Sequence, residues 1–250
     1  MAISIKSARE IELMRESCKK LGQVFDQMAA AVKPGMSTMD INNIGDRLIR
    51  ECGGIPNFLD YNGYPASICV SVNEEIVHGI PRKDKIIQEG DIVSLDAGLI
   101  WKGYHSDMAR TVAVGQVSKE CEDLMRVTKE CFFEGVKMAK AGNYLFDISN
   151  AIAAHATKHG YGIVRELVGH GIGTHLHEDP QIPNFAQTRR GPKLCAGMTL
   201  AIEPMINMGR ADVEWMDDDW TVVTEDGLPS AHYENTILIT DGEPEILTLI

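Results

Sequence analysis

The two halves of this sequence repeat one another at a single offset. The stretch VKPGMSTMDINNI (residues 32–44) aligns with AKAGNYLFDISNA (139–151), and the two share Lys, Gly, Asp, Ile and Asn residues. At the same offset, EGDIVSLDAG (89–98) aligns with AGMTLAIEPM (196–205). One short match could arise by chance, but two distant matches at one offset are far less expected. The repeat therefore predicts a duplicated helix-helix-strand unit with pseudo-twofold symmetry, and a site where the two halves meet.

Local patterns predict two helices followed by strands in each half. Apolar residues recur every three or four positions in the helical stretches, and Ser7 with Glu10 makes a capping box before the first. The predicted helices run from Ser7 to Pro34, from about 38 to 52, from Ser118 to near Gly142, and from about 146 to 159. β-Branched residues between turn signals predict strands within 67–115, 199–206, 220–224 and 235–240. We expect an α+β fold in one domain, residues 1–250, with halves of about 1–115 and 116–250.

Composition and charge disfavour several classes of protein. The 250 residues are 44% hydrophobic and 24% charged, which is typical of a globular domain. The net charge of −12 disfavours binding to specific nucleic acids or membrane surfaces, since both carry negative charge. MAISIKSARE (1–10) lacks the apolar core of a signal peptide, and no apolar run of about 18 residues predicts a membrane span. The six cysteines include no C-x-x-C pair, so we expect reduced thiols and a cytoplasmic protein.

Two aspartates flank the segment WKGY, which predicts a hairpin turn. If the turn centres near Trp101-Lys102, Asp96 and Asp107 lie roughly opposite each other on adjacent antiparallel strands, about 5 Å apart. Two like charges at that separation need a cation or a shared proton. The alternative is that they are unrelated polar residues near a solvent-exposed turn.

Two glutamates and a glycine-rich stretch add further candidates. Glu203 follows MTLAI, which is expected to be buried, and aligns with Asp96 in the repeat, while Glu234 precedes NTILIT. Either glutamate alone could be a strand-end carboxylate facing water. GHGIGTHLHEDP (169–180) supplies histidines on a backbone too rich in glycine for a helix. Four buried carboxylates and one imidazole need positive charge, which a pair of divalent ions supplies. Oxygen ligands with one nitrogen favour Mn, Fe(II) or Co over a structural thiolate zinc site.

These motifs resemble those of the type I methionine aminopeptidases over nearly the whole chain. The stretches that carry the resemblance are YNGYPASICVSVNEEIVHGIP (61–81), DIVSLDAGLIWKGYHSDMARTV (91–112), GHGIGTHLHEDP (169–180), TLAIEPM (199–205) and WTVVTEDGLPSAHYENTILIT (220–240). The resemblance implies the pita-bread fold, a curved antiparallel sheet flanked by helices with internal pseudo-twofold symmetry. This fold agrees with the repeat, and the whole chain would be a single catalytic domain.

The resemblance also implies roles for individual residues. Two divalent ions, Co, Mn or Fe(II), would be held by Asp96, Asp107, His170, Glu203 and Glu234. Asp107 and Glu234 would bridge both ions, and Glu203 would shuttle protons for a metal-bridged hydroxide that attacks the first peptide carbonyl. His177 would contact the carbonyl or the oxyanion, and His78 would approach the amide nitrogen. The glycines around these histidines would let substrate reach them.

The implied reaction removes the N-terminal methionine of nascent polypeptides when the second residue is small. An apolar pocket would hold the flexible thioether chain, with walls implied at Tyr61, Tyr64, Cys69, His78 and Trp220. The chain departs from the family pattern at Phe58, where a cysteine is usual, and at Leu176, where an aromatic residue is common. Both are apolar, so methionine preference is expected to persist. His175 has no matching role and is expected to be a surface or packing residue.

Two other functions share part of this pattern. Prolidases and aminopeptidase P use the same five ligands but usually carry an extra N-terminal domain, whereas this chain begins with the helix of the repeat. A non-catalytic binding module would typically have lost metal ligands, and all five are present. We expect nascent polypeptide N-termini as partners, with transient ribosome contact through the folded surface. We expect a monomer that binds neither membranes nor specific nucleic acids.

Overall fold

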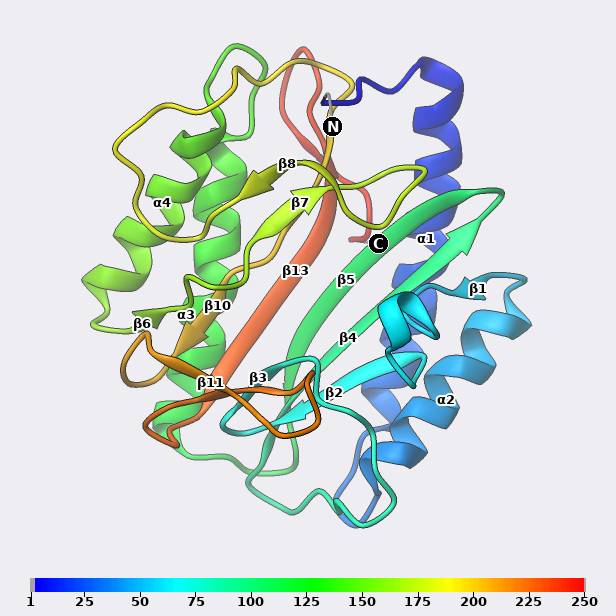
Figure 1. Cartoon of the computed structure of the whole chain (residues 1–250), viewed down its shortest axis with the longest axis vertical. Coiled ribbons are helices and arrows are strands. Elements are labelled where there is room, and N and C mark those ends of the chain that lie inside the picture. Colours follow the sequence, from blue (N-terminus) through cyan, green and yellow to red (C-terminus); the bar gives the residue numbers. More distant parts are fainter. Residues whose placement is uncertain (1–2, 250) are drawn as a thin grey trace.

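Two pairs of α-helices flank the strands in the computed structural model, which describes residues 3–249 (Figure 1). The helices are α1 (Ala8–Ala31), α2 (Thr38–Glu51), α3 (Lys119–Met138), α4 (Leu145–Lys158) and the short 3₁₀ helix η1 (Tyr61–Gly63). The capping box of α1 is confirmed, because Ser7 and Glu10 each accept a hydrogen bond from the other's backbone amide. Ser118 caps α3 by accepting from the Cys121 amide. The four predicted helices are confirmed, although α3 ends four residues earlier than expected, at Met138.

The strands form one 11-stranded sheet and a separate three-stranded sheet, and every pairing is antiparallel. Their bounds are β1 (Ile55–Pro56), β2 (Ile68–Val72), β3 (Glu75–Val77), β4 (Ile92–Trp101), β5 (Tyr104–Ala113), β6 (Gly162–Ile163), β7 (Gly169–Gly171), β8 (Glu178–Ile182), β9 (Thr199–Ile202), β10 (Met205–Asn207), β11 (Val213–Trp215), β12 (Val222–Thr224), β13 (Ser230–Leu238) and β14 (Glu245–Ile246). The main sheet has the order β1-β4-β5-β13-β9-β7-β8, with β2 beside β4, β10 and β14 beside β13, and β6 beside β10. The small sheet has the order β11-β12-β3.

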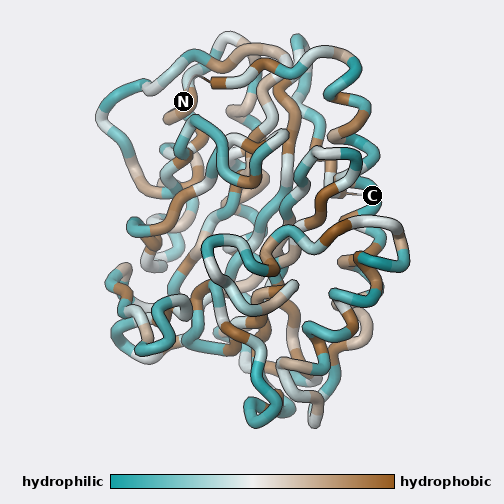
Figure 2. The backbone as a smooth tube through the Cα atoms, turned by 45° about the vertical axis from the view of Figure 1, so that its right-hand side comes forward, coloured by the Kyte–Doolittle hydropathy of each residue, from teal (hydrophilic) through white to brown (hydrophobic). Residues whose placement is uncertain are grey.

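Each helix pair packs on strands of its own half of the sequence. Phe25 of α1 lies in a buried cluster with residues of α2, β2 and β4, and Phe132 of α3 lies in another with α4, β9 and β13. Burying one such side chain contributes roughly 1.5–3 kcal/mol. In Figure 2 hydrophobic segments recur along the central strands, whereas the outer loops are mostly hydrophilic. The predicted α+β fold with an antiparallel sheet is thus confirmed.

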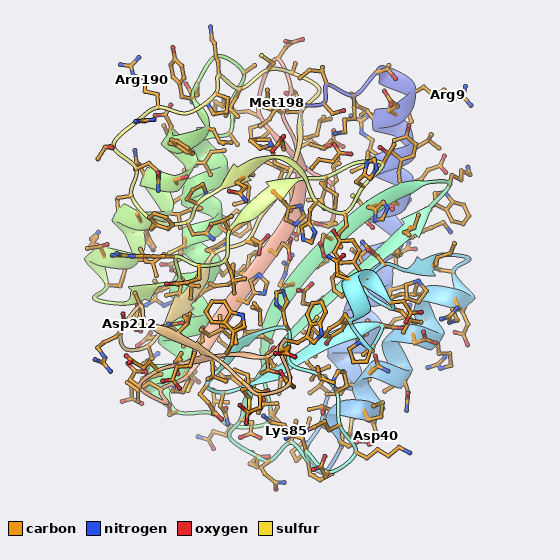
Figure 3. The ribbon with its side chains drawn as sticks, viewed as in Figure 1. Arg9, Asp40, Lys85, Arg190, Met198 and Asp212 are labelled. Carbon is orange, nitrogen blue, oxygen red and sulfur yellow. The ribbon has the colours of Figure 1, made fainter. Side chains whose placement is uncertain are left out.

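Many charged side chains lie on the outside of this structure. Arg9, Asp40 and Arg190 are exposed and lie at the periphery in Figure 3. Within residues 3–249, the helices are all too short or too polar to cross a membrane.

The hairpin of β4 and β5 differs from the predicted register. Trp101 pairs with Tyr104, so the turn centres on Lys102-Gly103, one residue later than expected. Both turn residues have positive φ, 50° and 83°, as a two-residue hairpin turn of type I′ requires. Asp96 therefore pairs with Ala109 rather than with Asp107. The predicted turn centre is therefore wrong, and the two aspartates, expected to lie roughly opposite each other, are diagonal neighbours on adjacent strands.

Two strand boundaries also differ from expectation. TLAIEPMI breaks at Glu203-Pro204 into β9 and β10, since proline has no amide hydrogen for pairing. Glu234 is not at the end of a strand, because β13 begins at Ser230 and continues to Leu238. The interpretation of Glu234 as a strand-end carboxylate facing water is wrong, as only 2% of the residue is exposed.

Candidate metal centre and substrate pocket

The five predicted ligands lie on neighbouring strands of the main sheet. They are Asp96 on β4, Asp107 on β5, Glu234 on β13, Glu203 directly after β9 and His170 on β7. These strands are consecutive in the order β4-β5-β13-β9-β7, so each ligand has another on the adjacent strand. The first two come from the first half of the sequence and the other three from the second. The halves meet where β5 pairs with β13.

The register places the three central carboxylates on one face of the sheet. Ala109 of β5 pairs with Asp96 on one side and with Glu234 on the other, so both carboxylates flank this small residue. Asp107 lies two residues before Ala109 and therefore projects from the same face. The two aspartates still project from the same face of the sheet, although they are diagonal neighbours. The reason is that a register shift of two residues does not move a side chain to the other face.

The other two ligands join this face through β9. Ile202 pairs with Asn235, which brings the next residue, Glu203, beside Glu234. His170 pairs with Ala201, two residues before Glu203. The His170 Nε2 atom lies 3.5 Å from a Glu203 carboxylate oxygen and 3.8 Å from an Asp107 carboxylate oxygen. Ligand atoms of Asp107, His170 and Glu234 all lie within 4.8 Å of one another.

Burial makes this group of acids electrostatically costly. Burial raises the pKa of Asp96 to about 7. The pKa values of Asp107, Glu203 and Glu234 are raised well above their usual range, first by burial and then by the neighbouring carboxylates. Among residues 3–249, these four acids form no ion pair with a lysine or arginine. One oxygen of Asp96 and one of Glu234 are buried without a hydrogen-bond partner.

His170 is held in the form that can bind a metal. Burial lowers its pKa to about 3, so the ring is neutral. Its Nδ1 atom lies 2.9 Å from the Gly171 carbonyl oxygen, to which it donates, so the lone pair is on Nε2 and faces the carboxylates. Unpartnered carboxylate oxygens with one imidazole nitrogen are a donor set that suits divalent ions such as Mn²⁺, Fe²⁺ or Co²⁺. The residues therefore fit a metal centre.

One pocket brings every predicted site residue together. It is lined by the five ligands, by Phe58, Tyr61, Tyr64, Cys69, His78, Leu176, His177 and Trp220, and by Asn62. Phe58, Cys69 and Leu176 are buried, and the Tyr64 and Trp220 rings pack edge to face with centroids 5.1 Å apart. The pocket thus has an apolar wall and a wall of ionisable groups.

Two histidines lie between these walls. The Tyr61 hydroxyl is 2.7 Å from His177 Nδ1, and the His177 ring is 4.4 Å from that of His170. If the tyrosine donates, His177 Nε2–H remains as a hydrogen-bond donor for another group. His78 has a positive φ of 59°, a conformation that is uncommon outside glycine and often found at functional sites. Burial lowers the pKa of His78 to about 4, so this ring is neutral as well.

The glycines of GHGIGTHLHEDP have a different use from the one expected. A Cβ atom on Gly169 would lie 2.4 Å from the Ala201 carbonyl oxygen, and one on Gly171 would lie 2.2 Å from that of Asp179. These glycines therefore allow β7 to approach β8 and β9 closely, which holds His170 in place. The interpretation that they admit substrate is wrong for these two positions.

Two residues near the site were not predicted from the sequence. Asn62 lines the pocket. His232 is 2% exposed, and among residues 3–249 neither of its ring nitrogens has a hydrogen-bond partner. Its Nε2 atom lies 3.9 Å from carboxylate oxygens of Glu203 and Glu234. The sequence contained a signal for His232, because it lies two residues before Glu234. On one strand, two such side chains project from the same face. His175 is exposed and does not line this pocket.

Comparison with known proteins identifies the class. The sequence profile of metallopeptidase family M24 matches residues 12–241. The chain therefore belongs to metallopeptidase family M24.

Within the family, its relatives are methionine aminopeptidases, and the resemblance inferred from the sequence is confirmed. A methionine aminopeptidase of Clostridium acetobutylicum is 51% identical over 247 residues, which cover 99% of each chain. The solved structure of a methionine aminopeptidase from Thermotoga maritima has a TM-score of 0.97 at 42% identity and covers 99% of this chain and all of that one. The Xaa-Pro dipeptidase of Bacillus anthracis shares the fold less closely, with a TM-score of 0.80 at 27% identity, and this chain covers 61% of it.

Proposed function

We propose that this chain is a metal-dependent methionyl aminopeptidase. It removes the N-terminal methionine from nascent polypeptides when the second residue is small. The observation that carries the proposal is the single pocket in which five metal-binding side chains adjoin an apolar wall. The 51% identity with a methionine aminopeptidase over nearly all of both chains supports the same activity.

We propose two divalent ions, Co, Mn or Fe(II), as cofactors. Asp96, Asp107, His170, Glu203 and Glu234 would hold them. When bound, such ions lower the pKa of water and polarise a carbonyl group. Their charge would also offset the repulsion among four buried carboxylates, which the histidines alone cannot do because they are neutral.

Glu203 is the proposed proton carrier. It follows the end of β9, where Pro204 interrupts pairing, and its side chain keeps 13% exposure at the pocket, whereas Glu234 keeps 2%. Its carboxylate would accept the proton of the attacking water as the carbonyl carbon becomes tetrahedral. It would then deliver that proton to the departing amine nitrogen as the carbon–nitrogen bond breaks.

His177 and His78 are the proposed contacts to the scissile amide. With Nδ1 engaged by Tyr61, His177 would donate from Nε2 to the carbonyl oxygen, whose negative charge grows in the transition state. His78 would face the amide nitrogen. Because burial keeps both rings neutral, each offers one donor without adding charge to the pocket.

The apolar wall would select methionine. Tyr64, Cys69, Trp220, Phe58 and Leu176 present apolar and aromatic surface to the pocket, which suits a flexible thioether chain. A small second residue would fit best, because the next position of the substrate lies beside the histidines and the metal ligands.

We further propose that residues 1–250 act as a single catalytic domain with two pseudo-symmetric halves. The chain would work as a monomer in the cytoplasm, with nascent N-termini as substrates and transient contact with the ribosome. Its net charge of −12 supports the absence of specific nucleic-acid and membrane binding.

The test compares peptides on protein loaded with Mn²⁺, Fe²⁺ or Co²⁺. We expect release of methionine from Met-Gly-Met-Met and little release when the second residue is large. An Xaa-Pro dipeptide should be a poor substrate. Faster cleavage of the Xaa-Pro dipeptide would replace the proposal with a proline-specific peptidase, and no hydrolysis with any of the three metals would replace it with a binding function.

A further inference from the structure

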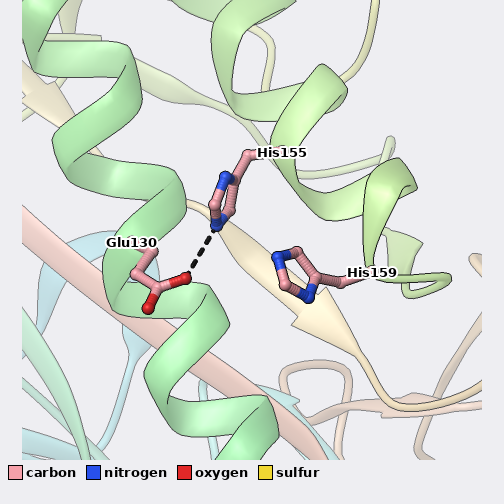
Figure 4. A group of neighbouring side chains, drawn as sticks. All are labelled: Glu130, His155 and His159. Carbon is pink, nitrogen blue, oxygen red and sulfur yellow. Dashed lines mark hydrogen bonds and ion pairs between the residues drawn. The ribbon is translucent and has the colours of Figure 1, made fainter.

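A second group of metal-binding side chains lies on the helical side of the molecule. Glu130 projects from α3, His155 from α4, and His159 from the residue that caps the C-terminus of α4 (Figure 4). One ligand atom from each residue lies within 4.8 Å of the other two. None of the three lines the substrate pocket. The cluster therefore needs an explanation separate from the aminopeptidase site.

The local geometry follows from helix spacing. His155 and His159 are four residues apart, so their rings lie on one face of α4, with centroids 4.8 Å apart. The packing of α3 against α4 brings Glu130 to this face, and its Oε2 atom lies 2.9 Å from His155 Nε2. The other oxygen of Glu130 accepts a hydrogen bond of 2.7 Å from Arg126. Arg126 thus fixes the carboxylate and leaves Oε2 directed at the histidines.

We propose that Glu130, His155 and His159 form a second metal site that takes a divalent ion of Zn²⁺ type. Two imidazoles and one carboxylate are a known set of zinc ligands, with the fourth position left to water. Imidazole nitrogen disfavours Mg²⁺ and Ca²⁺, which prefer oxygen ligands.

Binding requires only small movements. Ligand atoms about 2.0–2.1 Å from a tetrahedral ion lie about 3.3 Å from one another. The hydrogen bond between Glu130 and His155 would open slightly as each atom turns a lone pair to the ion, with the ring proton of His155 on Nδ1. His159 is exposed and can rotate toward them. A cation here also lies at the C-terminal end of α4, where the helix dipole favours positive charge. The ion would link α3 to α4.

The experiment measures zinc binding to the full chain and two variants. Equilibrium dialysis over a range of free Zn²⁺, followed by metal analysis, gives the number of ions per chain for wild type, H159Q and E130Q. We expect both variants to bind one zinc ion fewer than wild type, while aminopeptidase activity with Mn²⁺ stays unchanged. The control is E134Q, one turn along α3, because Glu134 is as exposed as Glu130, 38%, but pairs with Lys137. E134Q should bind as much zinc as wild type.

A second readout separates metal binding from simple packing. Added Zn²⁺ should raise the midpoint of thermal unfolding more in wild type and E134Q than in H159Q and E130Q. The proposal is overturned if all four proteins bind the same number of zinc ions. It is also overturned if H159Q and E130Q gain as much thermal stability from zinc as wild type does.

Discussion

Asp96, Ala109 and Glu234 form a row of paired residues across β4, β5 and β13, and Ala109 has the smallest side chain of the three. It is fully buried and pairs with Asp96 on one neighbouring strand and Glu234 on the other. Paired side chains on adjacent strands are about 5 Å apart, so the methyl group leaves room for both carboxylates to turn toward the proposed metal site. A larger side chain at this position would separate them.

Substitution of Ala109 should therefore impair catalysis more than folding. We expect Ala109→Leu to lower kcat/KM about 100-fold, because misplacement by about 1 Å can cost that much, and to destabilise the fold by about 1–3 kcal/mol through overpacking. Ala113→Leu is the control, since Ala113 lies exposed on the same strand. Steady-state kinetics and denaturant unfolding check both values. Equal kinetic effects in the two variants would contradict the role given to Ala109.

His232 should orient two of the acids. Its Nε2 atom is 3.9 Å from oxygens of both Glu203 and Glu234, so a small movement would bring it into hydrogen-bond distance of either proposed ligand. Hydrogen bonds to metal ligands typically contribute about 10–100-fold in affinity. We expect His232→Leu to weaken Mn²⁺ binding by about this factor, and His232→Gln, which keeps a donor, to weaken it less. Metal titration followed by activity measures both. Equal affinity in His232→Leu and wild type would exclude this role.

In the metal-free protein, Asp96 should make the free energy of unfolding depend on pH. Its pKa is raised from 3.8 to about 7 on folding, so the native state holds a proton that the unfolded state has lost between these values. The contribution of Asp96 to stability is thus present at low pH and is lost as pH rises toward about 7. We expect the stability of Asp96→Asn relative to wild type to increase from pH 4 to pH 7. Denaturant unfolding in the presence of chelator tests this, and a constant difference would contradict it.

The elements show which structural features local chemistry can predict. The helices were predicted because each carries local signals in its own sequence: apolar residues at helical spacing, glycine or proline stops, and, for two of them, the caps Ser7 and Ser118. The hairpin register was not, because WKGY allows two centres and only the positive φ of Lys102 and Gly103 selects one. The continuation of β13 through Glu234 was missed because a buried carboxylate in mid-strand opposes local propensity. It is stable only beside partners from other strands, which no single segment reveals.

The site was predicted more completely than the strands that carry it. Of the fourteen pocket residues, all but Asn62 were named from the sequence. The residue types and their local motifs gave Asp96, Asp107, Glu203, Glu234 and one histidine of the glycine-rich stretch. Resemblance to a family contributed the histidine and pocket positions. His232 was missed because a single histidine in a strand has no motif. The use of the glycines was misread because close contact between strands depends on tertiary packing.

The β7 strand should depend on its glycines. A Cβ on Gly171 would meet the Asp179 carbonyl oxygen at 2.2 Å, and backbone cannot yield as a flexible side chain can. We expect Gly171→Ala to destabilise the fold by about 1–3 kcal/mol and to reduce activity by displacing His170. Gly242→Ala is the control, because its Cβ would meet only the Thr240 hydroxyl at 3.9 Å. Thermal unfolding and kinetics provide the test, and wild-type values for Gly171→Ala would contradict it.

At the scale of the whole molecule, the repeat explains why the site forms between the halves. Asp96 and Asp107 come from the first half and the other three ligands from the second, and the two sets meet across the pairing of β5 with β13. Asp96 and Glu203 occupy equivalent positions of the repeat. Each half therefore carries part of an acidic cluster that neither can neutralise alone. Metal binding should therefore stabilise the contact between the two halves of the chain and also supply the catalytic chemistry.

Metal removal tests this link between charge and stability. Exhaustive chelation should abolish peptide hydrolysis and lower the unfolding temperature, because repulsion among the buried acids is then no longer offset. Restoring Mn²⁺ to about 100 times its dissociation constant should return about 2.7 kcal/mol per site. Mn²⁺ is the suitable probe, since the imidazole-rich cluster on α3 and α4 favours Zn²⁺ over it. Asp107→Asn should lose most of this gain, whereas E130Q should keep it. A chelated protein that remains fully active, or one whose unfolding temperature ignores Mn²⁺, would show that the acids are neutralised in some other way.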